Sequence, residues 1–331
     1  MLNDYNIVIV GLGYVGLPLA VSMVKKYNRV VAYDIDINRI SELQRGWDRT
    51  NEITSDELQS IKLSFTSELE HLSGKSIYIV TVPTPITHDL KPDLSYVKQA
   101  GRSVFESVVP GKNTIVVLES TVYPGVTSQT WLPEIDDVGL EIGADIEIAY
   151  CPERFNPGDP AHGVRQVARV IGCVNPEVGA GLVGLYSRLT SEDVRYVGKL
   201  EVAEASKVIE NVQRDINIAL VNELARIFPV MGVDVEDVLS AAATKWNFHR
   251  YTPGVGVGGH CIPVDPYYMI QRAADVGVPA ELITAARAVN RTMPIHVAGV
   301  LNELLYKAGV PSGEGKVLLL GWSYKAEVGD P

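Results

Sequence analysis

Residues 6–16 read NIVIVGLGYVG, a short apolar run followed by three glycines in the spacing Gly-x-Gly-x-x-Gly. The apolar run predicts a buried β-strand. A helical stretch follows to about Tyr27, and a second apolar strand is expected at residues 30–33. Strand, helix and strand in this order predict a βαβ unit, the start of an α/β domain.

The three glycines are typical of a dinucleotide site. Gly11 permits a tight turn, Gly13 lets the backbone approach a pyrophosphate, and Gly16 allows close packing of helix on strand. Asp34 ends the second strand, where a carboxylate can bond a ribose 2′-hydroxyl, and this favours NAD over NADP. A glycine-rich turn without a ligand is the alternative, but the flanking strand and helix argue against it.

Apolar strands continue to alternate with helical patterns further along the chain. The expected strands cover residues 77–80, 114–118, 146–150 and 170–172, and a helix is expected at 94–108. Such alternation predicts a doubly wound parallel sheet in an NAD-binding, Rossmann-like domain over residues 1–199.

The pattern then changes to helices. One long amphipathic helix is expected from Leu200 to about Val230, and further helices at 267–276 and 280–308, which together predict a central helical domain over residues 200–308. An apolar strand is expected at 316–320. We interpret residues 309–331 as the beginning of a truncated third, α/β domain that would bind UDP.

Composition excludes several classes of protein. The 331 residues are 46% hydrophobic and carry a net charge of −11, which gives no general attraction to nucleic acid or anionic lipid. The chain shows neither a basic leader nor an apolar run long enough for a membrane span, so we expect a cytoplasmic protein. Its three cysteines have no metal-ligand spacing, and neither a metal site nor a disulfide framework is expected.

Cys261 lies in a glycine-lined turn, four residues before Asp265. A thiolate can add to an aldehyde and form an adduct that loses a second hydride, which leaves a thioester for water to cleave. The alternative is a small buried apolar residue, the commonest role of a free cysteine. The polar loop favours the nucleophile.

Polar residues also follow the predicted strands, where ligands bind in open α/β sheets. The segments are 81–85 (TVPTP), 119–121 (EST) and 151–154 (CPER). The hydroxyls in the first two could bond a nicotinamide, although ordinary turn chemistry explains them equally well. Glu153 in the third segment is a candidate acid or base.

On the long helix, Glu204, Lys207 and Asn211 are spaced three and four residues apart and should share one face. Lysine and amide together could stabilise an oxyanion. The alternative, an exposed Glu204–Lys207 ion pair on a solvated face, is favoured by helix statistics alone.

Taken together, the motifs are similar to those of the UDP-glucose/GDP-mannose dehydrogenase family. They are GLGYVGLP (11–18), TVPTP (81–85), STV (120–122), PER (152–154), Lys207-x-x-x-Asn211 and GGHC (258–261), in the family's order between residues 7 and 330. The resemblance implies oxidation of a nucleotide sugar's C6 hydroxyl to a carboxylate with two NAD⁺. It also implies a homodimer formed through the long helix.

Residues 259–268 (GHCIPVDPYY) and 152–159 (PERFNPGD) resemble the branch that acts on UDP-N-acetylglucosamine and UDP-N-acetylgalactosamine. UDP-N-acetylmannosamine and UDP-glucose enzymes are the nearest alternatives, and the sugar's configuration stays open. The products of the resembled branch are precursors of surface polysaccharides such as capsule or O-antigen.

The resemblance assigns roles to individual residues. Cys261 is the nucleophile, Lys207 and Asn211 stabilise the oxyanion, Thr121 and Asp265 hold a water, and Glu153 assists hydrolysis of the acyl-enzyme. The implied cofactor contacts are Gly11, Gly13, Tyr14, Val15, Gly16, Asp34, Arg39, Thr81, Pro83, Thr84, Ser120, Thr121 and Lys325. The implied substrate contacts are Glu153, Arg154, Phe155, Lys207, Asn211, Arg250, Tyr251, Gly254 and Gly258.

Two other classes of protein stay open. A two-electron hydroxyacid dehydrogenase shares the order of sheet and long helix but does not need Cys261, and a non-catalytic NAD-binding module would bind NAD without turnover. The chain stops short of the family's nucleotide-binding domain, so we expect these 331 residues to bind NAD⁺ with weak or no activity.

Overall fold

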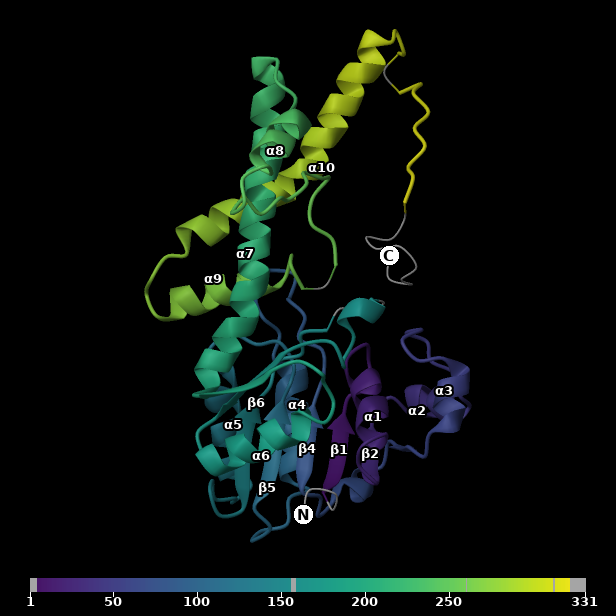
Figure 1. The fold of residues 1–331 in the computed structure, drawn as a ribbon, viewed down its shortest axis with the longest axis vertical. Coiled ribbons are helices and arrows are strands. Elements are labelled where there is room, and N and C mark those ends of the chain that lie inside the picture. The colour runs from purple at the N-terminus through teal and green to yellow at the C-terminus, as the bar shows by residue number, and fades with distance from the viewer. Residues whose placement is uncertain (1–4, 156–158, 260, 312, 322–331) are drawn as a thin grey trace. The chain divides into compact units, whose positions relative to one another are not determined.

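The structure is a computed structural model that describes residues 5–155, 159–259, 261–311 and 313–321. It contains two compact units, one that reaches Lys207 and one that begins at Val208 (Figure 1). The predicted cofactor contact Lys325 lies outside the described residues. The domain boundaries expected at 199/200 and 308/309 stay predictions.

The first unit contains an eight-stranded sheet in the order β3-β2-β1-β4-β5-β6-β7-β8. All neighbouring strands run parallel except β6 and β7, which are antiparallel. The predicted doubly wound α/β fold is confirmed. The strands are β1 (Asn6–Val10), β2 (Arg29–Tyr33), β3 (Ser64–Thr66), β4 (Ile77–Val80), β5 (Thr114–Leu118), β6 (Ile146–Tyr150), β7 (Arg169–Cys173) and β8 (Val194–Gly198).

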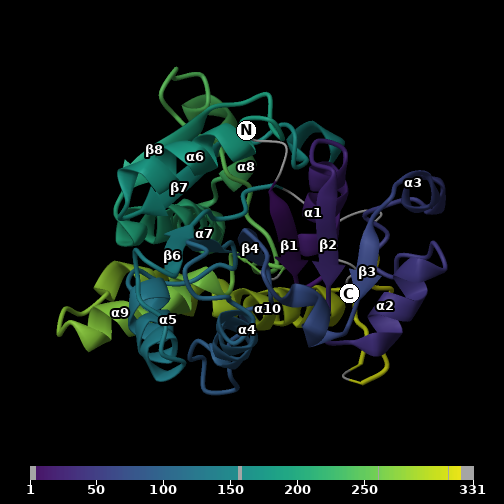
Figure 2. The same cartoon turned by 90° about the horizontal axis from the view of Figure 1, so that it is seen from below.

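Helices cover both faces of this sheet (Figure 2). Ile7 and Ile9 pack in one core cluster with α1 and α6, and Val8 and Val10 pack in a second cluster with α4 and α5. Both faces are therefore buried, which is why the central strands read as continuous apolar runs. The helices are α1 (Gly16–Val24), α2 (Ile37–Gln44), α3 (Ser55–Ser60), η1 (Leu69–Leu72), α4 (Ser95–Phe105), α5 (Val126–Asp137), η2 (Pro160–His162) and α6 (Pro176–Tyr186).

The second unit is helical, as predicted. The long helix α7 begins in the first unit and ends in the second, and the segment between α8 and α9 carries the glycine-rich loop and Cys261. Its elements are α7 (Leu200–Ile227), η3 (Phe228–Met231), α8 (Val235–Ala242), α9 (Asp265–Asp275) and α10 (Glu281–Lys307).

The prediction of a strand at residues 316–320 is wrong. These residues form no strand, and Leu318, Leu319 and Leu320 are exposed. A strand exists only as part of a hydrogen-bonded ladder, and no other strand of the described chain pairs with this segment.

Among the described residues, no helix is both long and apolar enough to cross a membrane. The same residues contain no group of three or more His, Cys, Asp and Glu side chains arranged to hold a metal ion.

Candidate functional site

The glycine-rich loop between β1 and α1 has the shape that a dinucleotide requires. Gly11 adopts a positive φ of 92°. A Cβ added at Gly16 would lie 1.8 Å from the Gly11 carbonyl oxygen, whereas a Cβ added at Gly13 would meet no atom within 4 Å. Gly16 is thus required by packing, and Gly13 borders open space that a pyrophosphate could approach. The loop residues Tyr14 and Val15 are half-buried.

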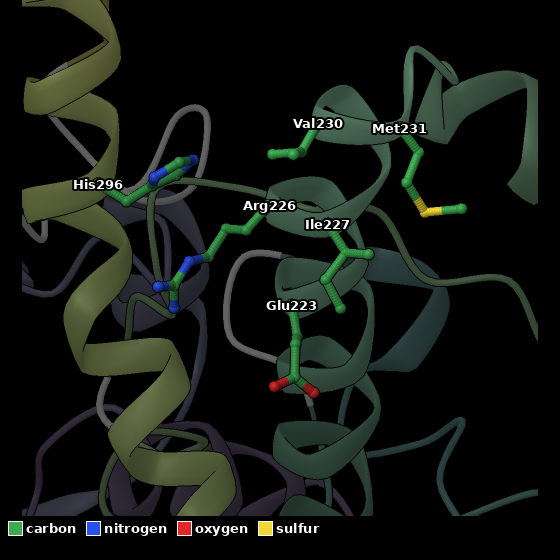
Figure 3. A pocket seen from close by; sticks show the side chains of 6 residues that line it. All are labelled: Glu223, Arg226, Ile227, Val230, Met231 and His296. Atoms are coloured by element: carbon green, nitrogen blue, oxygen red, sulfur yellow. The ribbon is translucent and has the colours of Figure 1, made fainter.

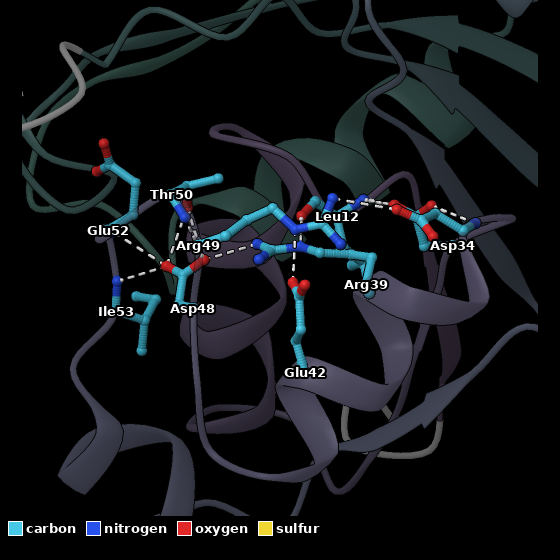
Figure 4. A network of polar contacts seen from close by, with 10 residues as sticks. Leu12, Asp34, Arg39, Glu42, Asp48, Arg49, Thr50, Glu52 and Ile53 are labelled. Atoms are coloured by element: carbon cyan, nitrogen blue, oxygen red, sulfur yellow. Dashed lines mark hydrogen bonds and ion pairs between the residues drawn. The ribbon is translucent and has the colours of Figure 1, made fainter. Parts of the chain in front are cut away.

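Asp34 is tied to the same loop (Figure 4). One carboxylate oxygen accepts a hydrogen bond from the Leu12 amide at 2.7 Å, and the other accepts one from the Asp36 amide at 2.9 Å. A carboxylate accepts about four hydrogen bonds, so capacity remains for a ribose hydroxyl. The residues around the loop therefore fit NAD.

Arg39 supports this loop from the inside. Its guanidinium is buried, its Nε donates to the Leu12 carbonyl at 2.8 Å, and its Nη2 lies 2.7 Å from Asp48 at an angle poorer than that of a hydrogen bond. Burial alone would raise the pKa of Asp48, but hydrogen bonds from Thr50 and Ile53 and the adjacent Arg39 guanidinium lower it. A contact of Arg39 with the cofactor stays a prediction.

Two predicted cofactor contacts use their hydroxyls within the protein. Thr81 donates to the Gly11 carbonyl at 2.8 Å, and Ser120 donates to the Val82 carbonyl at 2.6 Å. These bonds join separate loops, 70 and 38 residues apart in sequence, at the carboxyl edge of the sheet, so they are neither local turn contacts nor contacts to a cofactor. Of the other residues predicted there, Pro83 is exposed, whereas Thr84 and Thr121 are half-buried.

Glu153 follows β6 and is buried, and both of its carboxylate oxygens accept hydrogen bonds. One oxygen accepts the amides of Arg154 and Phe155, both at 2.7 Å, and the other accepts Arg169 Nη2 at 2.9 Å. The Arg154 guanidinium contacts the Ala168 carbonyl at 3.4 Å, and Phe155 packs against the core. In this structure the two predicted substrate contacts help to shape the turn that holds Glu153.

Sequence reasoning missed the partners of Glu153. Arg169 at the start of β7 lies between Glu153 and Glu119, with Nη1 3.3 Å from the Glu119 carboxylate. Tyr186 donates to the other Glu119 oxygen at 2.6 Å. Burial raises the pKa of Glu119 to about 7 against the opposing charge of Arg169. The sequence does show that Glu119, Glu153 and Arg169 each stand next to an apolar strand. Which of them pair, however, depends on the order of the strands in the sheet, which the sequence does not give directly.

On helix α7, Glu204 and Lys207 do not form the exposed ion pair that helix statistics favour. Glu204 is buried and accepts hydrogen bonds from the Gly125 amide at 2.5 Å and from the Thr127 amide and hydroxyl at 2.8 and 2.6 Å. It therefore caps the start of α5. The proposed exposed Glu204–Lys207 ion pair is wrong, and within the described chain half-buried Lys207 forms no ion pair.

In the second unit, Cys261, Asp265 and Asn211 form a connected group. The Cys261 carbonyl accepts the Asp265 amide at 2.9 Å as α9 begins, and the buried Asp265 carboxylate accepts the Asn211 side-chain amide at 2.5 Å. Arg214 in turn donates to the Asn211 amide oxygen.

The three cysteines differ sharply in their surroundings. Cys261 is exposed, whereas Cys151 and Cys173 are buried in the first unit, where burial raises the pKa of both thiols. The alternative of a buried structural cysteine therefore fits Cys151 and Cys173 but not Cys261.

The glycine-rich loop before Cys261 is anchored to two helices. The Gly254 amide donates to Asn222 at 2.9 Å, Asn222 donates to Asn290 at 2.9 Å, and Asn290 donates to Asp215 at 2.8 Å. Arg250 forms an ion pair with Glu236. The remaining predicted substrate contacts are half-buried Tyr251 and exposed Gly258.

A separate cavity of about 600 Å³ lies between α7 and α10, where the side chains of Arg226 and His296 approach from opposite helices (Figure 3). Its lining contains no predicted site residue. The full lining consists of Glu223, Arg226, Ile227, Val230, Met231 and His296.

A dinucleotide loop on a doubly wound sheet, followed by a helical unit with an exposed cysteine four residues before a buried aspartate, is typical of an NAD-dependent dehydrogenase. Two family models match the chain: the NAD-binding domain of the UDP-glucose/GDP-mannose dehydrogenase family over residues 5–190, and the central domain of that family over 201–292. The chain belongs to the UDP-glucose/GDP-mannose dehydrogenase family, and the predicted family and cofactor are confirmed.

Among characterised relatives, the chain is 44% identical to UDP-N-acetyl-D-glucosamine 6-dehydrogenase of Pseudomonas aeruginosa, covering 99% of this chain and 78% of that protein. It is 43% identical to protein CapL of Staphylococcus aureus, covering 98% and 76%. The solved structure of UDP-D-N-acetylmannosamine dehydrogenase from Pyrococcus horikoshii aligns with a TM-score of 0.85 at 35% identity, covering 92% and 72%.

Proposed function

We propose that the protein is a UDP-N-acetylhexosamine 6-dehydrogenase that oxidises the C6 hydroxyl of UDP-N-acetylglucosamine or UDP-N-acetylgalactosamine to a carboxylate. The exposed residue Cys261, whose backbone carbonyl accepts the amide of Asp265, carries the proposal because a two-electron oxidation needs no nucleophile. Relatives from Pseudomonas aeruginosa and Salmonella typhi, both named UDP-N-acetyl-D-glucosamine 6-dehydrogenase, support the substrate.

The chemistry proceeds in four balanced steps. The loop of Gly11, Gly13 and Gly16 together with Asp34 would hold NAD⁺, which would supply the acceptor for the hydride that leaves C6 in each of two oxidations, first of the alcohol and then of the thiohemiacetal. Between them, the Cys261 thiolate adds to the aldehyde carbon and forms the thiohemiacetal. After the second oxidation, water cleaves the resulting thioester, and the thiol and the carboxylate are released. Overall, one alcohol, two NAD⁺ and one water give one carboxylate, two NADH and three protons.

The site residues divide this work. Lys207 and Asn211 stabilise the negative charge on oxygen in the alkoxide and the thiohemiacetal, which favours departure of hydride. Thr121 and Asp265 hold the water, and Glu153 removes its proton during thioester cleavage.

UDP-N-acetylmannosamine is the second candidate substrate. A relative from Pyrococcus horikoshii with 36% identity is named for it, and so is the aligned structure. UDP-glucose is a third candidate. Hydrogen-bonding contacts to the N-acetyl and hydroxyl groups would distinguish the sugars.

The test is the number of NADH formed per sugar consumed, measured with the full-length protein and the UDP forms of N-acetylglucosamine, N-acetylgalactosamine, N-acetylmannosamine and glucose in parallel. Two NADH per sugar are expected with an N-acetylhexosamine. One NADH would favour a two-electron hydroxyacid dehydrogenase. NAD⁺ binding without turnover on any sugar would favour a non-catalytic module.

We also propose a homodimer that works in the cytoplasm on surface polysaccharide precursors. Exposed Ile209, Leu220 and Ile227 on α7 are spaced 11 and 7 residues apart, close to three and two helical turns, so they form one apolar stripe. Such a stripe suits a second copy of the same helix. NAD⁺ and UDP-sugars are both available in the cytoplasm, which supports the location.

A further inference from the structure

We propose that Arg169 is a positioning residue that orients the Glu153 carboxylate for cleavage of the acyl-enzyme, and that Glu119 and Tyr186 fix Arg169 in place. This inference rests on the proposed function, because it assumes a thioester on Cys261 and a general base at Glu153.

The hydrogen bonds that Glu153 accepts hold its carboxylate in a single orientation. Two amides of its own turn bind one oxygen, and Arg169 binds the other at 2.9 Å. Of about four acceptor positions on a carboxylate, three are occupied by donors of the described chain, so about one remains for a water. A base held in this way can accept a proton from one direction only, which is what efficient hydrolysis requires.

The sheet topology explains how Arg169 reaches Glu153. β6 and β7 are antiparallel, with Tyr150 opposite Gly172. Continued beyond these pairs in the direction of the two strands, this register sets residue 153 opposite residue 169. In a fully parallel sheet, the start of β7 would instead lie at the edge opposite the end of β6. The strand reversal thus brings a cation to the carboxyl edge of the sheet.

Arg169 itself is held from two further elements. Glu119 at the end of β5 lies 3.3 Å away, and the guanidinium lies 5.1 Å from the centre of the Tyr186 ring on α6. The Tyr186 hydroxyl fixes Glu119 at 2.6 Å. The guanidinium, both carboxylates and Tyr186 are all buried, so solvent does not weaken these contacts.

A purely structural ion pair makes a different prediction from a positioning residue. Structural loss would lower stability and slow every step together. Loss of positioning would spare both hydride transfers and slow only the hydrolysis of the acyl-enzyme. The two hydrides can be followed as NADH absorbance, and the acyl group on Cys261 can be followed by intact mass.

The experiment compares Arg169→Met and Arg169→Lys with wild type in the full-length protein, by rapid mixing with NAD⁺ and the substrate identified above. Arg169→Met is expected to give a burst of two NADH and an accumulated acyl-enzyme, with hydrolysis slowed about 10²-fold, the lower end of what a general base contributes. Arg169→Lys should recover part of this loss because it restores the charge without the planar fork.

Tyr186→Phe releases Glu119 without removing a charge, and a smaller slowing of the same step is expected. Tyr27→Phe is its matched control, because Tyr27 is equally buried in this unit but donates only to the Leu185 carbonyl. If Arg169→Met fails to fold, Arg169→Lys and Tyr186→Phe carry the test.

Equal slowing of hydride transfer and hydrolysis in Arg169→Lys, without accumulated acyl-enzyme, would overturn the positioning role. The same change in Tyr27→Phe as in Tyr186→Phe would also overturn it. A wild-type protein that forms one NADH per sugar and no thioester would instead defeat the proposed function, so the two failures are distinguishable.

Discussion

Exposure separates the three cysteines and predicts their reactivity. The Cys261 thiol is open to reagents, whereas burial raises the pKa of Cys151 and Cys173. We expect iodoacetamide to alkylate the native chain at Cys261 alone, since reactivity follows thiolate formation and access. Peptide mass mapping measures this, with the urea-unfolded chain, in which all three react, as the control. Alkylation of Cys151 or Cys173 at the rate of Cys261 would contradict it.

Glu119 should make folding stability depend on pH. Its pKa in the folded chain, about 7, lies above the ordinary 4.5, so the folded state holds the proton more tightly. The resulting stability is fully present below about pH 4.5 and is lost as the pH rises through about 7. Glu119→Gln should remove this pH-dependent loss of folding stability. The loss is about 3 kcal/mol at most, since each unit of pKa shift corresponds to about 1.36 kcal/mol.

Urea unfolding of wild type and Glu119→Gln at pH 5 and pH 8 measures the difference. Exposed Glu177 on α6 offers a control, because Glu177→Gln should leave the wild-type pH dependence intact. An unchanged slope in Glu119→Gln would show that Glu119 does not carry the effect.

At the residue scale, sequence indicates a site only where the signal is local. Cys261 was identified from its own loop; its exposure is consistent with that choice, and its role as the nucleophile stays a prediction. Arg169 was missed because its importance depends on pairing with Glu153 and Glu119, which are 16 and 50 residues away. Glu204 was misread because the Gly125 amide that it caps at the start of α5 is 79 residues away in sequence.

At the scale of elements, substitutions at the last two glycines of the loop, Gly13 and Gly16, should have opposite effects. Gly16→Ala would place a methyl group 1.8 Å from the Gly11 carbonyl oxygen, and backbone cannot yield as a side chain can. We expect a loss of about 1–3 kcal/mol or more in stability. Gly13→Ala meets no atom, so stability should persist while NAD⁺ affinity falls about tenfold, or about 1.4 kcal/mol.

Thermal unfolding and calorimetric titration with NAD⁺ measure the two effects separately. Each variant is the other's control. A destabilised Gly13→Ala, or a Gly16→Ala with wild-type stability, would contradict the assigned roles.

Central strands were predictable because both of their faces are buried and their sequences are continuously apolar. β3 and β8 were missed: β3 has three residues, two of them hydroxylated, and β8 contains an exposed Arg195. Both lie at sheet edges, where polar residues are tolerated. The prediction of a strand at 316–320 was wrong for the opposite reason. The segment is apolar, but it has no neighbouring strand in the described chain with which to form hydrogen bonds.

At the scale of the molecule, the apolar stripe on α7 predicts the assembly. Leu220→Glu should place a charge on the helix-to-helix interface and shift the full-length protein from dimer to monomer. Analytical ultracentrifugation measures the change. Leu282→Glu, an exposed leucine on α10, is the matched control and should remain dimeric. A dimer that survives Leu220→Glu with unchanged affinity would place the interface elsewhere.

The antiparallel pairing of β6 and β7 also constrains how the sequence of this protein can change. Insertions and deletions between Phe155 and Arg169 alter the length of the connection but leave residues 153 and 169 opposite each other. A shift of one residue within β7 would turn Arg169 towards the opposite core, where Val170 now packs. Length variation should therefore be tolerated in the connecting segment. Within β7, an insertion or deletion of a single residue should not be tolerated, because it would reverse the alternation of side chains between the two faces.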